Sequence, residues 1–130
     1  MQGNVFIVED NEWLVCMYRS IFQSMGCRVT HASTTSDAVR LLHGMKTDLI
    51  IIDDRLPDGS GIDVTHEFRF QLEESDTPII YTTSQLSTLD ERALQSAGYA
   101  SVVTKPLDIG AFSALVRRYV GNQSPTDARA

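Results

Sequence analysis

The sequence predicts an α/β domain in which a doubly wound, five-stranded parallel sheet carries helices on both faces. Two observations support this fold class. Short apolar segments alternate five times with helix-like segments, and the connections between them are short. The third apolar segment, Leu49–Asp53, is a continuous run (LIIID) of the kind found in strands that are buried on both faces. Right-handed crossovers between such strands place helices above and below a parallel sheet.

The apolar runs give the strands. The expected strands are Val5–Val8, Arg28–Ala32, Leu49–Asp53, Pro78–Thr82 and Ser101–Thr104. A proline is acceptable as the first residue of a strand because no ladder donor is needed there.

Capping residues and glycines bound the helices. Asn11 is a suitable N-cap for a helix from about Glu12, and Gly26 ends it. Further helices are expected after Thr34 or Thr35, over Ile62–Leu72, over Leu89–Ala97, and from an Asp108 cap to about Val120.

Composition narrows the possible functions. The chain has 130 residues, 42% of them hydrophobic, and a net charge of −6, which disfavours a nucleic-acid surface. No apolar run is long enough to span a membrane, and the N-terminus becomes acidic too early for a signal peptide. Cys16 and Cys27 form no CxxC pattern, so both are expected to pack in a reducing cytoplasm.

Charged and hydroxyl residues follow several expected strands. These residues are Glu9, Asp10, Asp53, Thr83, Ser84 and Lys105. The ends of parallel strands meet at one edge of the sheet, where open α/β folds bind their ligands. Carboxylates held close together repel one another, and a hard cation such as Mg²⁺ relieves that repulsion. A hydroxyl donor and a lysine opposite them would bind an anion, so the pattern fits a phosphoryl group with a carboxylate as nucleophile.

These segments resemble the receiver domain of two-component response regulators. The resemblance rests on FIVEDN, DLIIIDDRLPDGSG, TPIIYTTS and VVTKP, in this order, and extends from Asn4 to about Val120. It implies a flavodoxin-like sheet with strand order 2-1-3-4-5. We therefore expect a receiver domain over residues 1–120 and a flexible C-terminal tail over residues 121–130.

The resemblance also implies a role for each site residue. Asp53 would accept the phosphoryl group. Asp10 and Asp53 would bind Mg²⁺ directly, with the backbone carbonyl of Arg55 as a third ligand, and Glu9 would act through a bound water. Lys105 would pair with one phosphoryl oxygen, and Thr83 would donate a hydrogen bond to another.

Other positions follow from the same resemblance. The backbone N–H of Ser84 would assist Thr83, and a cis peptide bond is expected before Pro106. Arg55 and Gln85 occupy the two positions that tune dephosphorylation in receivers.

The chain departs from the receiver pattern at one position, and two other residues, Asp54 and Trp13, are expected to have no part in the site. Val102 stands where receivers usually carry a rotating Tyr or Phe, and Tyr99 lies three positions earlier. The aromatic half of the usual switch is therefore in question. Asp54 is expected to be an exposed loop acid that faces away from the site, and Trp13 to pack at the start of the first helix.

The predicted function is a phosphorylation-dependent switch, not an enzyme. Its expected partners are a sensor histidine kinase or histidine phosphotransfer protein and a downstream protein target, and it would be a monomer or a phosphorylation-dependent dimer. Little sequence lies outside the five units, so we expect a single-domain response regulator, unless the chain is a piece of a longer protein.

Three alternatives fit the sequence less well than a receiver domain. A pseudo-receiver would keep the fold without phosphorylation, which the intact acceptor set disfavours. A haloacid-dehalogenase-like phosphohydrolase needs a second Asp where Arg55 stands. A dinucleotide-binding fold needs a GxGxxG motif after the first strand, and none is present.

Overall fold

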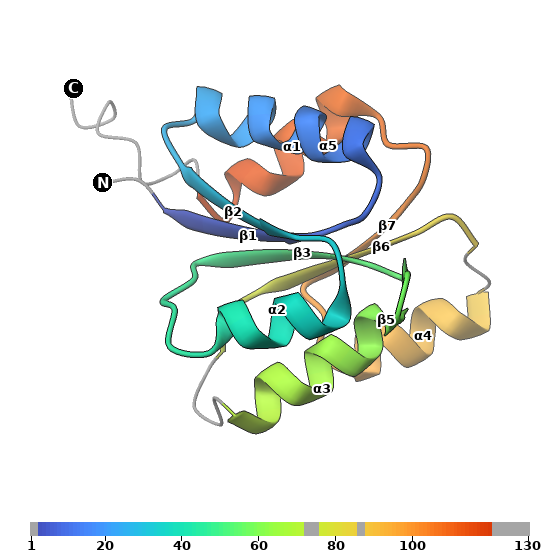
Figure 1. Ribbon diagram of the computed structural model, residues 1–130. Helices are drawn as coiled ribbons and strands as arrows, with labels where there is room; N and C mark the ends of the chain where they lie inside the picture. The colour runs from blue at the N-terminus through green and yellow to red at the C-terminus, as the bar shows by residue number, and fades with distance from the viewer. Residues whose placement is uncertain (1–2, 72–75, 86–87, 121–130) are drawn as a thin grey trace.

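The computed structural model describes residues 3–71, 76–85 and 88–120 and contains the predicted parallel sheet (Figure 1). The sheet has five strands in the order β2-β1-β3-β6-β7, and every neighbouring pair is parallel. Its strands are β1 (Asn4–Val8), β2 (Arg28–Ala32), β3 (Leu49–Asp53), β6 (Ile79–Thr83) and β7 (Ser101–Thr104). This order is the 2-1-3-4-5 order of flavodoxin-like folds, so the predicted fold class is confirmed.

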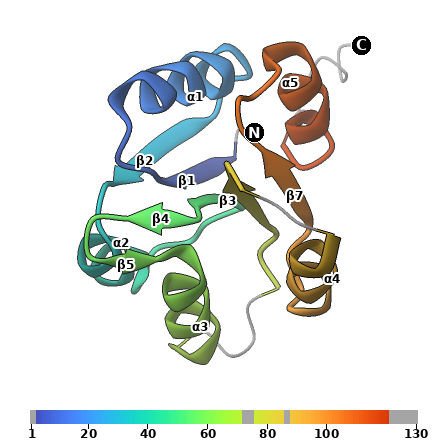
Figure 2. The ribbon, with the colours of Figure 1, turned by 90° about the vertical axis from the view of Figure 1, so that its right-hand side faces the viewer.

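Over residues 3–71, 76–85 and 88–120, five helices cover the two faces of the sheet. They are α1 (Glu12–Ser24), α2 (Thr35–Leu42), α3 (Gly61–Gln71), α4 (Thr88–Ser96) and α5 (Ile109–Arg117). Helices α1 and α5 lie on one face, and α2, α3 and α4 lie on the other (Figures 1 and 2). Among the described residues, no helix is long and apolar enough to cross a membrane.

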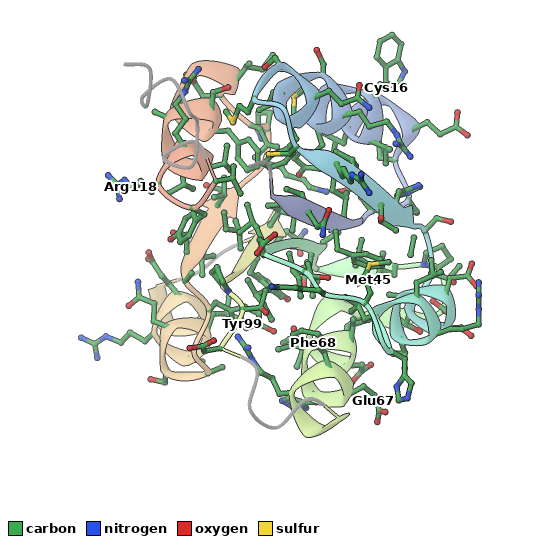
Figure 3. All side chains as sticks on the ribbon, turned by 90° about the vertical axis from the view of Figure 1, so that its left-hand side faces the viewer. Cys16, Met45, Glu67, Phe68, Tyr99 and Arg118 are labelled. Atoms are coloured by element: carbon green, nitrogen blue, oxygen red, sulfur yellow. The ribbon has the colours of Figure 1, made fainter. Side chains whose placement is uncertain are left out.

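Alternation along the strands divides the core into two layers. In β3, Ile50 and Ile52 belong to the layer under α2, α3 and α4, whereas Leu49 and Ile51 belong to the layer under α1 and α5. Phe68 and Tyr99 point into the first layer, while Glu67, next to Phe68, points outward (Figure 3). The same alternation decides which face each residue at the strand ends serves.

Helix caps and most boundaries agree with the predictions. Asn11 caps α1 through its side chain, Thr34 caps α2 and Asp108 caps α5. Strand β6 starts one residue later than predicted, at Ile79, and α5 ends at Arg117. The predicted C-terminal tail lies outside the described residues.

Two local expectations were wrong, and one short element was not predicted. The element that was not predicted follows Asp53, where β4 (Arg55–Leu56) and β5 (Gly59–Ser60) pair as a short antiparallel hairpin. Trp13 does not pack, since 86% of it is exposed on α1. Cys27 is buried as expected, but Cys16 is exposed.

Candidate functional site

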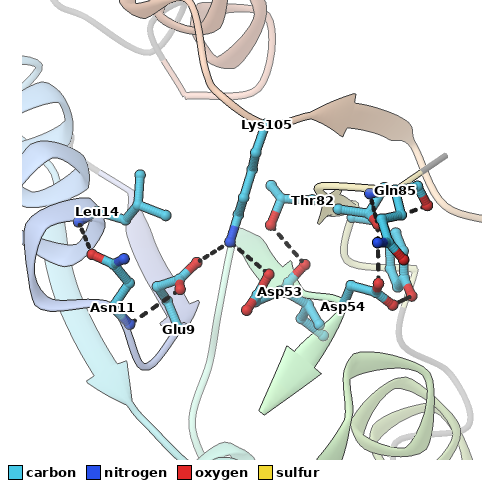
Figure 4. Close-up of polar contacts among 11 residues, drawn as sticks. Glu9, Asn11, Leu14, Asp53, Asp54, Thr82, Gln85 and Lys105 are labelled. Carbon is cyan, nitrogen blue, oxygen red and sulfur yellow. Dashed lines mark hydrogen bonds and ion pairs between the residues drawn. The ribbon is translucent and has the colours of Figure 1, made fainter.

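The polar site lies at the edge where the parallel strands end, which Figure 2 views end-on. Asp53 is the last residue of β3, Glu9 and Asp10 follow β1, and Lys105 follows β7. The Lys105 Nζ donates to Asp53 Oδ1 at 2.7 Å and to Glu9 Oε1 at 3.2 Å (Figure 4). The structure thus brings together residues from three strands that are far apart in sequence.

Burial shapes the electrostatics of this site. The pKa of Asp53 lies above its ordinary value because burial disfavours the charged carboxylate, and Lys105 only partly offsets that effect. The pKa of Glu9 is raised by burial and by the charge of Asp53. Burial lowers the pKa of Lys105, but its bonds to Asp53 and Glu9 outweigh burial and leave the pKa raised. The two buried carboxylates therefore lack full compensation in the resting protein.

Asp10 completes an acidic cluster with access to solvent. Carboxylate oxygens of Glu9, Asp10 and Asp53 lie within 4.8 Å of one another, with Asp10 exposed and the other two buried. Clustered oxygen donors beside water are the environment that Mg²⁺ prefers. These three residues can hold a divalent cation, and such a cation would relieve the repulsion between their carboxylates, which adds to burial in raising the pKa of Glu9.

Three hydrogen bonds from backbone N–H groups to carboxylates fix the loops after β1 and β3. Asn11 donates from its backbone to Glu9 Oε2 at 3.1 Å, so the cap of α1 also orients a site carboxylate (Figure 4). Asp58, in the turn of the β4–β5 hairpin, accepts hydrogen bonds from the backbone of Thr35 and Ser36 at the start of α2. These bonds hold the pKa of Asp58 below its ordinary value.

A glycine allows the loop to return against β3. A Cβ on Gly61 would lie 2.3 Å from the backbone oxygen of Asp53 and 2.3 Å from Ile52 Cγ2. Only glycine permits this approach without displacing the strand that carries Asp53.

Comparison with known proteins identifies this arrangement. The family model of the response regulator receiver domain matches residues 5–117. The chain belongs to this family. It is therefore a regulatory receiver domain of two-component signalling and not a classical enzyme.

Two curated relatives that match this domain differ greatly in the share of their length that it covers. The receiver domain is 28% identical over 125 residues to the aerobic respiration control sensor protein ArcB of Escherichia coli K12, covering 96% of this chain and 16% of ArcB. It is 28% identical over 122 residues to the polar-differentiation response regulator DivK of Brucella anthropi, covering 94% of this chain and 99% of DivK. The chain thus spans about a sixth of ArcB and nearly all of DivK.

Solved structures agree with the family. The receiver domain of the sensor histidine kinase PA1611 from Pseudomonas aeruginosa PAO1 is 28% identical with a TM-score of 0.79, covering 92% of this chain and 98% of that one. That structure has a magnesium ion coordinated in its active-site cleft. The non-phosphorylated HemR receiver domain from Leptospira biflexa is 27% identical with a TM-score of 0.83, covering 91% and 94% of the two chains.

Thr83 is hydrogen-bonded to Asp54, a residue that was expected to face away from the site. Thr83 Oγ1 donates to Asp54 Oδ2 at 3.0 Å, and the Tyr81 hydroxyl donates to Asp54 Oδ1. Asp54 is half-buried, so the expectation of an exposed loop acid was wrong. Strand alternation was the available signal, because Asp54, Tyr81 and Thr83 all face the α2–α4 side.

The remaining site residues are placed as follows. Arg55 donates from its guanidinium to Gln85 Oε1 at 3.2 Å, which joins the two exposed positions expected to tune dephosphorylation. Ser84 is exposed directly after β6. The Lys105–Pro106 peptide bond is cis, as the resemblance implied.

Two tyrosines lie close to the position where receivers usually carry an aromatic ring. Val102 is half-buried against the core layer that includes Tyr81 and Tyr99. The rings of Tyr81 and Tyr99 lie 4.9 Å apart, and the Tyr99 hydroxyl donates to Thr65 on α3 at 2.8 Å. Tyr81 and Tyr99 therefore supply aromatic rings to the core layer against which Val102 packs, while Val102 itself supplies no ring.

Proposed function

We propose that this receiver domain accepts a phosphoryl group on Asp53 and uses it as a signalling switch. The observation that carries the proposal is the buried Asp53 carboxylate, hydrogen-bonded by Lys105 at 2.7 Å and adjacent to Glu9 and Asp10. A nucleophile beside both a fixed cation and a cluster suited to a divalent cation fits transfer of an anionic group. The donor would be a phosphohistidine on a sensor histidine kinase or a histidine phosphotransfer protein.

The transfer would be a displacement at phosphorus. An Asp53 carboxylate oxygen forms the new O–P bond while the P–N bond to the donor imidazole breaks. The bonding pair goes to that nitrogen, and a donor ring protonated on its other nitrogen leaves as neutral histidine. Lys105 would pair with a phosphoryl oxygen, Thr83 would donate a hydrogen bond to another, and the Ser84 N–H would assist.

Magnesium would be held by Asp10, Asp53 and the backbone carbonyl of Arg55, with Glu9 acting through water. When bound, it would neutralise carboxylate and phosphoryl charge. The raised pKa of Asp53, caused first by burial, supports this assignment because it marks a carboxylate whose negative charge is incompletely compensated.

The output would be a change in binding to a downstream protein in the cytoplasm. A net charge of −6 disfavours direct binding to nucleic acid. Likeness to both ArcB and DivK supports a place in a two-component pathway or a phosphorelay, as a monomer or as a dimer formed on phosphorylation.

The test is intact-mass analysis after incubation with acetyl phosphate and Mg²⁺. The wild type is expected to gain the mass of one phosphoryl group, and Asp53→Asn should gain none. Asp63→Asn, which removes an exposed carboxylate on α3, serves as the matched control and should behave as the wild type. A gain that persists in Asp53→Asn would refute the acceptor. A folded wild type that neither gains mass nor binds beryllofluoride with Mg²⁺ would be a pseudo-receiver.

A further inference from the structure

A second polar cluster borders the acceptor site on the α2–α4 side of the sheet. It consists of Asp54, Tyr81 and Thr83. Residues 79–83 pair with β3 so that Asp53 stands opposite Thr82, and alternation then turns Asp54, Tyr81 and Thr83 toward one face. The phosphoacceptor and this cluster are therefore neighbours in sequence that face different layers.

The Asp54 carboxylate accepts one hydrogen bond on each oxygen. Thr83 donates to Oδ2 at 3.0 Å, and Tyr81 donates to Oδ1 (Figure 4 labels Asp54). Burial raises the pKa of the Tyr81 hydroxyl, and its bond to Asp54 raises it further, so the hydroxyl keeps its proton and remains a donor. Asp54 is thus fixed from one side by Tyr81 and presents its second oxygen to Thr83.

Thr83 has a single hydroxyl proton to give. Its alternative acceptor is the backbone oxygen of Gln85 at 3.2 Å, a neutral group at a longer distance. Hydrogen bonds to a charged acceptor are about twice as strong as those to a neutral one. The proton of Thr83 is therefore committed to Asp54 in this resting structure.

The surroundings leave room for that bond to be exchanged. A cavity of about 270 Å³ is lined by Asp54, Tyr81 and Thr83 together with apolar residues that include Ile62 and Leu94. This space lies beside the Thr83–Asp54 hydrogen bond.

We propose that Asp54 is a positioning residue that holds the Thr83 hydroxyl in the resting state, and that a phosphoryl group on Asp53 must compete with it for that hydrogen bond. The proposal rests on the proposed function and deepens it. Asp54 would raise the free energy of the phosphorylated conformation, because its hydrogen bond with Thr83 must first be broken. Tyr81 would strengthen this effect by holding the Asp54 carboxylate in place.

The first experiment measures beryllofluoride binding in the presence of Mg²⁺ by ¹⁹F NMR. Asp54→Ala removes the competing acceptor and is expected to bind beryllofluoride about tenfold more tightly than the wild type. Asp54→Asn keeps one acceptor oxygen but loses the charge that strengthens the hydrogen bond, so its affinity should lie between those of the wild type and Asp54→Ala. Tyr81→Phe, which removes only the hydroxyl that fixes Asp54, should tighten binding by an intermediate factor.

A double-mutant cycle separates this hydrogen bond from simple charge repulsion. In a Thr83→Val background, which removes the hydroxyl but keeps the shape, Asp54→Ala should change the affinity by less than about twofold. An equal tightening in both backgrounds would show that Asp54 acts through its charge and would overturn the proposal. Unchanged or weaker binding by Asp54→Ala in the wild-type background would overturn it as well.

A readout without magnesium or beryllofluoride tests the resting state directly. Three-bond couplings to the Thr83 methyl carbon report its χ1 rotamer, which should be single in the wild type and averaged in Asp54→Ala. A rotamer that stays single in both Asp54→Ala and Tyr81→Phe would contradict the proposal. If the couplings change as expected but the wild type fails to bind beryllofluoride, the proposed function fails and the resting contact alone survives.

Discussion

Replacing Lys105 by Met removes a cation from a nearly buried site while keeping most of the side-chain volume. The Nζ lies 2.7 Å from Asp53 and 3.2 Å from Glu9, whose side chains are only 9% and 1% exposed. Removing one partner of a buried ion pair costs about 3–5 kcal/mol, because the other charge is left without compensation. The Lys105 side chain is 18% exposed, and Asp10 beside it is open to solvent, so we expect the lower end, about 3 kcal/mol.

Thermal unfolding with EDTA and with saturating Mg²⁺ tests this expectation. In EDTA, Lys105→Met should unfold about 10 °C below the wild type, since 1 kcal/mol shifts the midpoint of a domain of this size by about 3–4 °C. With Mg²⁺ the difference should fall below about 3 °C, because a cation bound only by the folded protein compensates the carboxylates and stabilises by mass action.

The matched control is Lys46→Met, which removes the same charge from an exposed position in the segment before β3. It should lower the midpoint by less than about 2 °C in either condition, as most surface substitutions do. Equal losses for Lys105→Met with and without Mg²⁺ would refute the idea that lysine and metal compensate the same carboxylates.

Three further predictions concern the acceptor and its loop. Burial raises the pKa of Asp53 above its ordinary 3.8, so between these two pKa values the folded protein holds a proton that the unfolded chain has released. The free energy of unfolding in urea without metal should therefore fall as the pH rises through the folded pKa. Asp53→Asn should flatten this dependence. Gly61→Ala should cost about 3 kcal/mol in urea unfolding, whereas Gly110→Ala, whose Cβ meets only a side-chain oxygen at 3.4 Å, should be neutral or slightly stabilising. Arg55→Ala, which breaks the contact with Gln85, should shorten the phosphoryl half-life severalfold by admitting water, as followed by loss of mass; an unchanged half-life would contradict this.

The fold was predictable because each strand carries its own signal. The LIIID run required a strand covered on both faces, and all five residues of β3 are buried. Asn11 and Asp108 cap helices where the sequence placed them, since a cap is a local contact between a side chain and the next backbone turn. The predicted fold and family followed from such local features taken in order.

Burial that depends on contacts between distant segments could not be predicted from local sequence patterns. Trp13 is apolar and adjacent to a helix start, but the helix turns it to solvent because Val15 and Tyr18 take the inward positions. Asp54 was assigned to solvent from its place after the strand. Strand alternation turns Asp54, Tyr81 and Thr83 to the same face, and the register of β6 against β3 then brings them together.

The hydrogen bonds of the resting structure would limit how strongly the proposed phosphoryl group on Asp53 could shift this domain between two states. A ligand shifts an equilibrium only by its differential interaction with the two states, and a change from 1:99 to 99:1 needs about 5.5 kcal/mol. Two of the bonds that would be exchanged, Lys105 with Asp53 and Thr83 with Asp54, are charge-assisted already, so the new bonds to phosphate replace interactions worth about 1.5–3 kcal/mol each. The net gain per exchanged bond is therefore a small difference between similar terms. Under the proposed function, a complete switch would need both exchanges together with compensation of the acidic cluster. Replacing Lys105 or Thr83 should then leave a mixture of the two states.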